Sequence, residues 1–172
     1  MQKSATTGGG LTNRLQILIG FAVLLVGTFV YLTDRPPDHI YFLSIGPAAM
    51  SFYGAVPHLF GPIGNSLPSF AHVFSVILIT AGVLSCHKKG YLIICSAWLL
   101  VDCAFEWGQK STAWCSGMIP DCFSNIPFLE NIETYFLNGT FDPVDVVAIL
   151  IGTLTAYMVL IKTDKTIRRQ NQ

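Results

Sequence analysis

The hydrophobic residues of this chain are gathered in long stretches that short polar segments separate. Three stretches are long enough to cross a bilayer as helices, which takes about 20 residues, and a fourth is a further candidate. We therefore predict four membrane-spanning helices, at residues 15–33, 67–85, 90–106 and 144–161. Together they predict an all-α integral membrane bundle that forms a single domain.

Composition also indicates a membrane protein. The chain has 172 residues, of which 52% are hydrophobic and 12% are charged. Soluble domains carry about 25% charged residues, and the mean hydropathy of +0.54 points the same way. The first apolar stretch is too long for the core of a typical signal peptide and no small-residue cleavage site follows, so we expect a retained helix. The net charge is zero and there is no basic block, so the sequence indicates no nucleic-acid partner.

Most basic residues lie on one side of the predicted membrane. With four spans, the tails 1–14 and 162–172 share a side with the short turn before residue 90. That side holds Lys3, Arg14, Lys88, Lys89, Lys162, Lys165, Arg168 and Arg169, whereas the loops 34–66 and 107–143 hold Arg35 and Lys110. Because cytoplasmic segments of membrane proteins are rich in Lys and Arg, the sequence predicts cytoplasmic termini and two outer loops. The predicted location is the bacterial inner membrane, which the chain crosses several times.

Two features of the predicted outer loops refine this topology. Residues 40–60 are apolar but contain Pro47 and Pro57, and a fifth span here would place the basic clusters on opposite sides. We therefore favour a re-entrant or interfacial segment on the outer side over a fifth span. In the second loop, Cys115 and Cys122 flank a turn-forming Gly and Pro. They predict a disulfide if the outside is oxidising, with two free thiols as the alternative.

Acidic residues interrupt the third predicted span. Asp102 and Glu106 are four residues apart and Gln109 follows three residues later, so the three share one face of a helix. An ionisable group inside a membrane span is costly unless it is paired or hydrated, which makes it a candidate functional residue. With the rise of an α-helix, Glu106 lies about 25 Å from the inner turn, near the outer boundary, and Asp102 lies one turn deeper.

Polar residues of two other spans fall at the same depth as Glu106. His72 belongs to the first turns of the second span, and Asp142 and Asp145 open the last one. We therefore predict a polar site at the outer mouth of the bundle. A general base with a histidine partner is the catalytic hypothesis, and a bound divalent cation is another, with no cofactor assigned. The candidate catalytic residues are Glu106, His72 and Asp145, and the candidate ligand-binding residues are Gln109, Asp142 and Asp102.

Each of these residues also has a structural interpretation. Asp142 followed by Pro143 matches the N-cap and the first position of a helix, and Asp145 suits the positive end of the helix dipole. Glu106 can simply reach headgroup water at the membrane surface. His72 and Asp102 can serve as polar contacts between helices, so the structural and functional interpretations both stay open.

The last span carries a packing pattern as well. Ala148, Gly152 and Ala156 recur every four residues, which is typical of helices that approach each other closely in membranes. Asp145 lies three residues before Ala148, so we expect it to point toward the same contact face.

Three short motifs in order resemble the VanZ-like family of small membrane proteins. They are Leu67-Pro-Ser-Phe-Ala-His72-Val-Phe, Phe105-Glu106-Trp-Gly-Gln109 and Gly139-Thr-Phe-Asp142-Pro-Val-Asp145-Val-Val-Ala148. The resemblance implies a multi-pass plasma-membrane protein, and the founding members of that family are linked to reduced susceptibility to a glycopeptide antibiotic. It brings no settled reaction with it. The chain departs from the family pattern at Ile149, where an Asn is usual, and at Gly139, where an Arg is usual.

Two functions are consistent with these observations. The first is a cell-envelope protein whose outer polar site acts on or binds a lipid-linked precursor, a lipid headgroup or a lipophilic antibiotic. The second is a non-enzymatic accessory or scaffold subunit of a larger membrane complex, in which the polar residues hold helices together. Membrane lipid is the expected partner in the first, and another membrane protein in the second.

Overall fold

The computed structural model describes residues 9–34, 51–56, 59–112, 117, 119–120, 123, 126 and 132–170. In this part of the chain the regular structure is helical, with one isolated bridge between Tyr53 and Val56. The long helices are α1 (Gly9–Asp34), α3 (Leu67–Val83), α4 (Lys88–Lys110) and α7 (Pro143–Gln170). The short ones are the 3-10 helix η3 (Gly61–Asn65) and α6 (Ile132–Asn138). Each of the four predicted spans therefore corresponds to one long helix.

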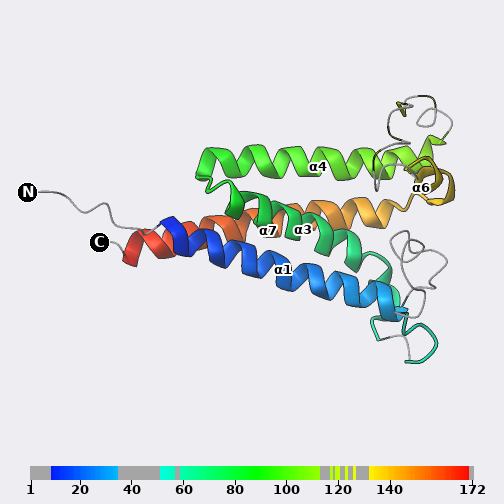
Figure 1. Cartoon of the computed structure of the whole chain (residues 1–172), viewed down its shortest axis with the longest axis horizontal. Coiled ribbons are helices and arrows are strands. Elements are labelled where there is room, and N and C mark those ends of the chain that lie inside the picture. Colours follow the sequence, from blue (N-terminus) through cyan, green and yellow to red (C-terminus); the bar gives the residue numbers. More distant parts are fainter. Residues whose placement is uncertain are drawn as a thin grey trace, which may run out of the picture.

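The long helices form an elongated antiparallel bundle (Figure 1). The start of α1, the end of α7 and the turn between α3 and α4 lie together at one end, which we call the turn end. The end of α4, the start of α7 and α6 lie at the opposite end, which we call the α6 end. Helices α3 and α7 lie between α1 and α4. Each of these two central helices packs on all three other long helices.

The surface of the bundle is apolar where lipid would surround it. Three helical segments are long and apolar enough to cross a membrane: Arg14–Asp34, Lys88–Lys110 and Pro143–Asp164. Large apolar side chains on them are exposed rather than buried, among them Leu18, Leu25, Ile93, Leu100 and Leu154. Because a water-soluble protein rarely exposes such extended apolar faces, the fold is that of a helical membrane bundle, as predicted.

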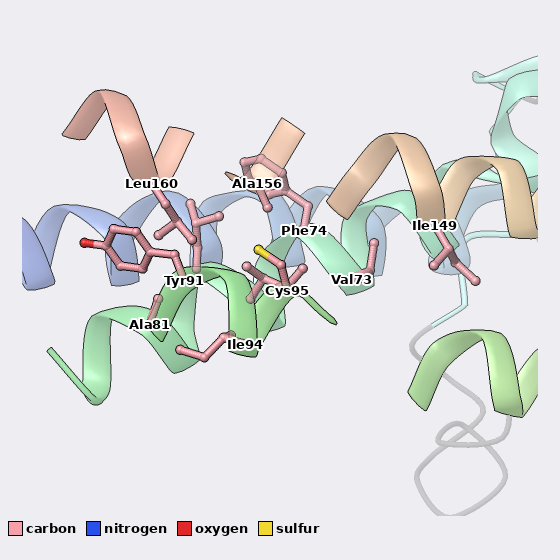
Figure 2. Close-up of a cluster of buried hydrophobic side chains, with 11 residues drawn as sticks. Val73, Phe74, Ala81, Tyr91, Ile94, Cys95, Ile149, Ala156 and Leu160 are labelled. Carbon is pink, nitrogen blue, oxygen red and sulfur yellow. The ribbon is translucent and has the colours of Figure 1, made fainter. Parts of the chain in front are cut away.

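Helix α3 is the most enclosed of the four. It has 17 residues, about 25 Å of helix, which is shorter than the roughly 30 Å hydrocarbon core of a bilayer. Its residues Val73, Ile77, Leu78 and Ala81 are fully buried and form the centre of the hydrophobic core (Figure 2). The predicted span 67–85 is slightly too long, because Ser85 takes a left-handed conformation with φ 51°.

The end of α3 is fixed by a complete C-terminal cap. The backbone N–H of Cys86 donates to the carbonyl of Ala81, and the N–H of Ser85 donates to the carbonyl of Gly82. This pair of bonds with a left-handed residue is the Schellman motif, which closes a helix and reverses the chain. Helix α4 then begins at Lys88 and runs back along α3.

Small residues set the spacing of α3 from its neighbours. A Cβ atom on Gly152 of α7 would lie 2.6 Å from Val73 and 2.9 Å from the carbonyl oxygen of Phe70. On α1, a Cβ atom at Gly20 would lie 2.8 Å from Ile79. Gly152 and Ala156 are buried and Ala148 is partly buried, so the packing face predicted for the last span is confirmed.

The segment that follows α1 is tied to the end of that helix. The carboxylate of Asp34 accepts hydrogen bonds from the backbone N–H groups of Leu59, at 3.2 Å, and Phe60, at 3.0 Å. The N–H of Phe52 donates to the carbonyl of Leu32 at 2.8 Å. Most of the segment 40–60 lies outside the described residues, so its re-entrant or interfacial path stays a prediction. Cys115 and Cys122 also lie outside them, and their disulfide stays a prediction too.

Candidate functional site

The start of α7 confirms the structural interpretation of Asp142. Its side-chain Oδ1 accepts a hydrogen bond of 2.9 Å from the N–H of Val144, the second residue of the helix. Its carbonyl accepts one of 3.0 Å from the N–H of Asp145. Asp142 is therefore the N-cap of α7, with Pro143 at the first helical position where no N–H is needed. This cap fixes where the next acid, Asp145, stands.

Glu106 and Asp145 come together between α4 and α7, and we call them the acid pair. Glu106 is only 8% exposed, and the carboxylate of Asp145 lies close enough to repel it. The backbone N–H of Asp142 is directed at the Glu106 carboxylate. Within the described part of the chain, Glu106 Oε2 and Asp145 Oδ1 are buried and have no hydrogen-bond partner. Each acid of the pair thus has one buried oxygen without a donor, although the Asp142 N–H reaches the Glu106 carboxylate.

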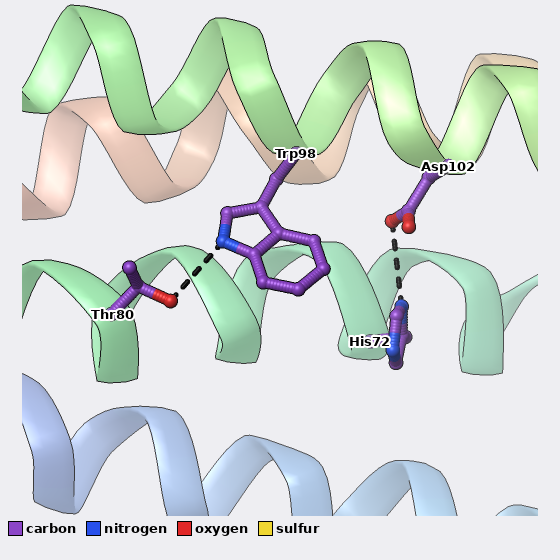
Figure 3. Close-up of polar contacts among 4 residues, drawn as sticks. All are labelled: His72, Thr80, Trp98 and Asp102. Atoms are coloured by element: carbon purple, nitrogen blue, oxygen red, sulfur yellow. Dashed lines mark hydrogen bonds and ion pairs between the residues drawn. The ribbon is translucent and has the colours of Figure 1, made fainter. Parts of the chain in front are cut away.

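Asp102 and His72 form a different contact, between α4 and α3. The Nδ1 atom of His72 lies 3.4 Å from Oδ2 of Asp102 (Figure 3). Asp102 is 8% exposed, whereas the His72 side chain is 53% exposed. Two turns further along α3, the indole N–H of Trp98 donates to Oγ1 of Thr80 at 3.1 Å, so these two polar contacts lie along the same helix interface (Figure 3).

The predicted layer of polar residues therefore separates into two contacts. The sequence places His72 beside Glu106 or Asp145 as a catalytic partner, but the hydrogen bond of His72 in the structure goes to Asp102. Residues four apart on a helix differ by about 40° in direction, so Asp102 turns toward α3 while Glu106 turns toward α7. Gln109 is partly buried, three residues beyond Glu106.

A metal site at this layer does not form from the described residues. No group of three or more His, Cys, Asp or Glu side chains among them is arranged to hold a metal ion. His72 in particular pairs with Asp102 on the α3 side of α4.

Aromatic residues border the acid pair at the α6 end. Trp107 and Phe141 pack edge to face with ring centroids 6.5 Å apart. The ammonium group of Lys110 lies 5.0 Å from the Trp107 ring centroid and 5.2 Å from that of Phe141. Trp107 is exposed, as is common for tryptophan at a membrane–water interface.

The turn end holds a polar network that the sequence pattern did not predict. Gln16 is fully buried, and its amide nitrogen donates to the hydroxyl of Tyr91 at 3.3 Å and to Oγ1 of Thr163 at 3.0 Å. These three residues join α1, α4 and α7. The signal was present, because Gln16 interrupts the first apolar stretch close to one end of the span, as Glu106 does in the third span.

Comparison of the chain with protein-family models, with curated proteins and with solved structures finds no match in any of the three. The resemblance to the VanZ-like family therefore rests on the three sequence motifs alone.

Proposed function

We propose that this is a multi-pass plasma-membrane protein of the VanZ-like type that binds the polar headgroup of an envelope lipid or lipid-linked precursor at the acid pair. One observation carries the proposal: Glu106 Oε2 and Asp145 Oδ1 are buried acceptors without a donor among the described residues. An unsatisfied buried polar group costs about 1–3 kcal/mol, and more when it is charged. A ligand that supplies donors removes that cost.

The position of the acid pair supports an amphipathic ligand. Glu106 lies about one turn from the end of α4 at Lys110, beside the exposed ring of Trp107. A site this close to the end of a span supports a ligand at headgroup depth rather than at the bilayer centre. The α7 residues Val144 and Val147 are exposed apolar groups near Asp145, where an acyl chain can lie.

The basic residues of the turn end support the predicted orientation. Arg14, Lys88, Lys89 and Lys162 are exposed there, which supports a cytoplasmic turn end and an outward-facing α6 end. The acid pair then meets the outer leaflet and the lipid-linked precursors it contains.

The family assignment is supported by the position of its motifs at one end of the bundle. His72, Glu106 and Asp145 come from the three motifs and lie on three helices at the α6 end. Ile149, which stands where the family has Asn, is 3% exposed and packs in the core. We therefore propose binding rather than a reaction that needs that Asn.

The test is the lipid that the purified full chain retains. Wild-type protein, Glu106→Gln and the control Glu133→Gln are extracted in mild detergent, and bound lipid per protein is measured by mass spectrometry. Glu133 is an exposed acid on α6 at the same end. Because charge-assisted hydrogen bonds are the strong ones, we expect Glu106→Gln to retain roughly tenfold less lipid and Glu133→Gln to equal wild type. Equal retention by all three proteins overturns the proposal.

A second candidate function is that of a non-enzymatic scaffold subunit. The contacts His72–Asp102 and Trp98–Thr80 favour it, because they use the polar residues of the third span to join helices. Chemical cross-linking in intact membranes followed by mild extraction tests it, and a protein that stays monomeric and without partners contradicts it.

A further inference from the structure

The charges around the acid pair restrict the chemistry of its ligand. Asp145, Asp142 and Asp102 all lie close enough to Glu106 to act on it electrostatically. Asp142 also turns a backbone N–H toward Glu106, but that amide carries no charge. The charged side chains that act on Glu106 are therefore all acidic among the described residues.

The basic side chains near the acid pair are engaged elsewhere. His72 contacts Asp102 at 3.4 Å, on the α3 side of α4. The Lys110 ammonium lies over the rings of Trp107 and Phe141. Within the ranges that the structure describes, His72–Asp102 is the ion pair formed in this layer, and Glu106 and Asp145 form none with a basic residue.

Resting on the proposed function, we infer that the group bound by the acid pair is a cationic nitrogen, the primary ammonium of a lipid headgroup, held between Glu106 Oε2 and Asp145 Oδ1. An ammonium group has three N–H donors and no acceptor, so one group serves both unpartnered oxygens. Its charge also offsets the repulsion between the two acids.

Other headgroup chemistries fit less well. A neutral hydroxyl donates one hydrogen and leaves the charges of both acids uncompensated. A phosphate or another anionic headgroup is repelled by Glu106 and the three acids around it. A divalent metal ion needs more ligands than the two unpartnered oxygens, and the described residues hold no group of three suitable side chains.

The aromatic border is suited to the same chemistry. Cations bind favourably over tryptophan and phenylalanine rings, and Lys110 already places its ammonium 5.0 Å from the Trp107 centroid. The rings beside the acid pair thus already hold one ammonium group in this structure.

The experiment titrates delipidated full-length protein in detergent with three lipids and follows binding by native mass spectrometry. The lipids are phosphatidylethanolamine, its N-acetylated form, which lacks the ammonium charge, and phosphatidylglycerol. We expect phosphatidylethanolamine to bind at least about tenfold more tightly than the other two, because only it supplies charge-assisted donors to both acids.

Single substitutions test whether the preference for phosphatidylethanolamine arises at the acid pair. Glu106→Gln and Asp145→Asn each remove it, and Glu133→Gln keeps it. Thermal unfolding checks that each variant is folded, and having a variant on each of two helices keeps the test valid if one fails to fold.

The outcomes separate the two proposals. If all three lipids bind equally and Glu106→Gln weakens all of them, the headgroup site stands and the ammonium inference is wrong. If no lipid responds to Glu106→Gln or Asp145→Asn, both are wrong. A preference for phosphatidylethanolamine that only these two variants remove supports both.

Discussion

Asp102 and Glu106 are the most instructive pair of residues in this protein. They stand one turn apart on the same helix, and each is 8% exposed. Asp102 has His72 within 3.4 Å, whereas Oε2 of Glu106 has no partner among the described residues. Two equally buried acids therefore differ in their environment: Asp102 joins two helices, and Glu106 keeps an oxygen without a partner among the described residues, which is the basis of the proposed ligand site.

The difference arises from the neighbours of α4. Helix α4 packs on both α3 and α7, and a step of four residues turns a side chain by about 40°. Asp102 meets a histidine on α3, while Glu106 meets a second acid on α7. The different partners of Asp102 and Glu106 thus depend on how α3 and α7 are placed against each other.

The largest effect is expected from Gly152→Val, which disturbs both acids together. The first atom of the new side chain would lie 2.6 Å from Val73, so α7 must move away from α3. Overpacking of this kind costs about 1–3 kcal/mol. We expect the free energy of unfolding, measured in detergent, to fall by that amount, and lipid retention to fall with it.

The matched control for this change is Ala97→Val on α4. Ala97 is exposed, so the added methyl groups face lipid or detergent and stability stays close to wild type. If Gly152→Val is as stable as Ala97→Val, the close approach of α7 to α3 does not position the two acids.

The next largest effect is a difference in stability between a variant that removes the partner of Asp102 and one that changes Glu106. His72→Ala leaves Asp102 buried without its partner, and we expect a loss of about 1–2 kcal/mol in the free energy of unfolding. Glu106→Gln removes a buried charge that has an unpartnered oxygen, so it should leave stability unchanged or raise it slightly. Chemical unfolding in mixed micelles measures both.

His87→Ala is the control for His72→Ala, because His87 is exposed in the turn between α3 and α4. The contrast between the acids fails if Glu106→Gln destabilises the protein as much as His72→Ala does. In that case Glu106 is also a structural residue.

The fold followed from the sequence because lipid imposes a simple requirement on it. Each span must be a helix with an apolar surface, so hydropathy alone located all four long helices. The position of the polar layer near one end of the bundle was also predicted from helix rise. The partners within the layer were not, because pairing depends on the rotation of each helix, and His72 turned to Asp102 instead of Glu106.

Gln16 shows the same limit at the other end of the bundle. A glutamine near the start of an apolar stretch is expected at the membrane surface, yet it is fully buried between Tyr91 and Thr163. Only the packing of α1, α4 and α7 reveals that its amide has partners there.

The smallest effect is expected at this turn-end network. Tyr91→Phe removes the hydroxyl that accepts from Gln16 at 3.3 Å and leaves the bond from Gln16 to Thr163 in place. Single hydrogen bonds between membrane helices contribute about 0.6 kcal/mol on average, so we expect a loss of that size in the free energy of unfolding. Lipid retention should not change, because this network lies at the opposite end from the acid pair. Tyr157→Phe, on a partly buried tyrosine of α7, is the control. A loss of bound lipid in Tyr91→Phe alone would mean that the two ends of the bundle are coupled and that the acid pair is not an independent site.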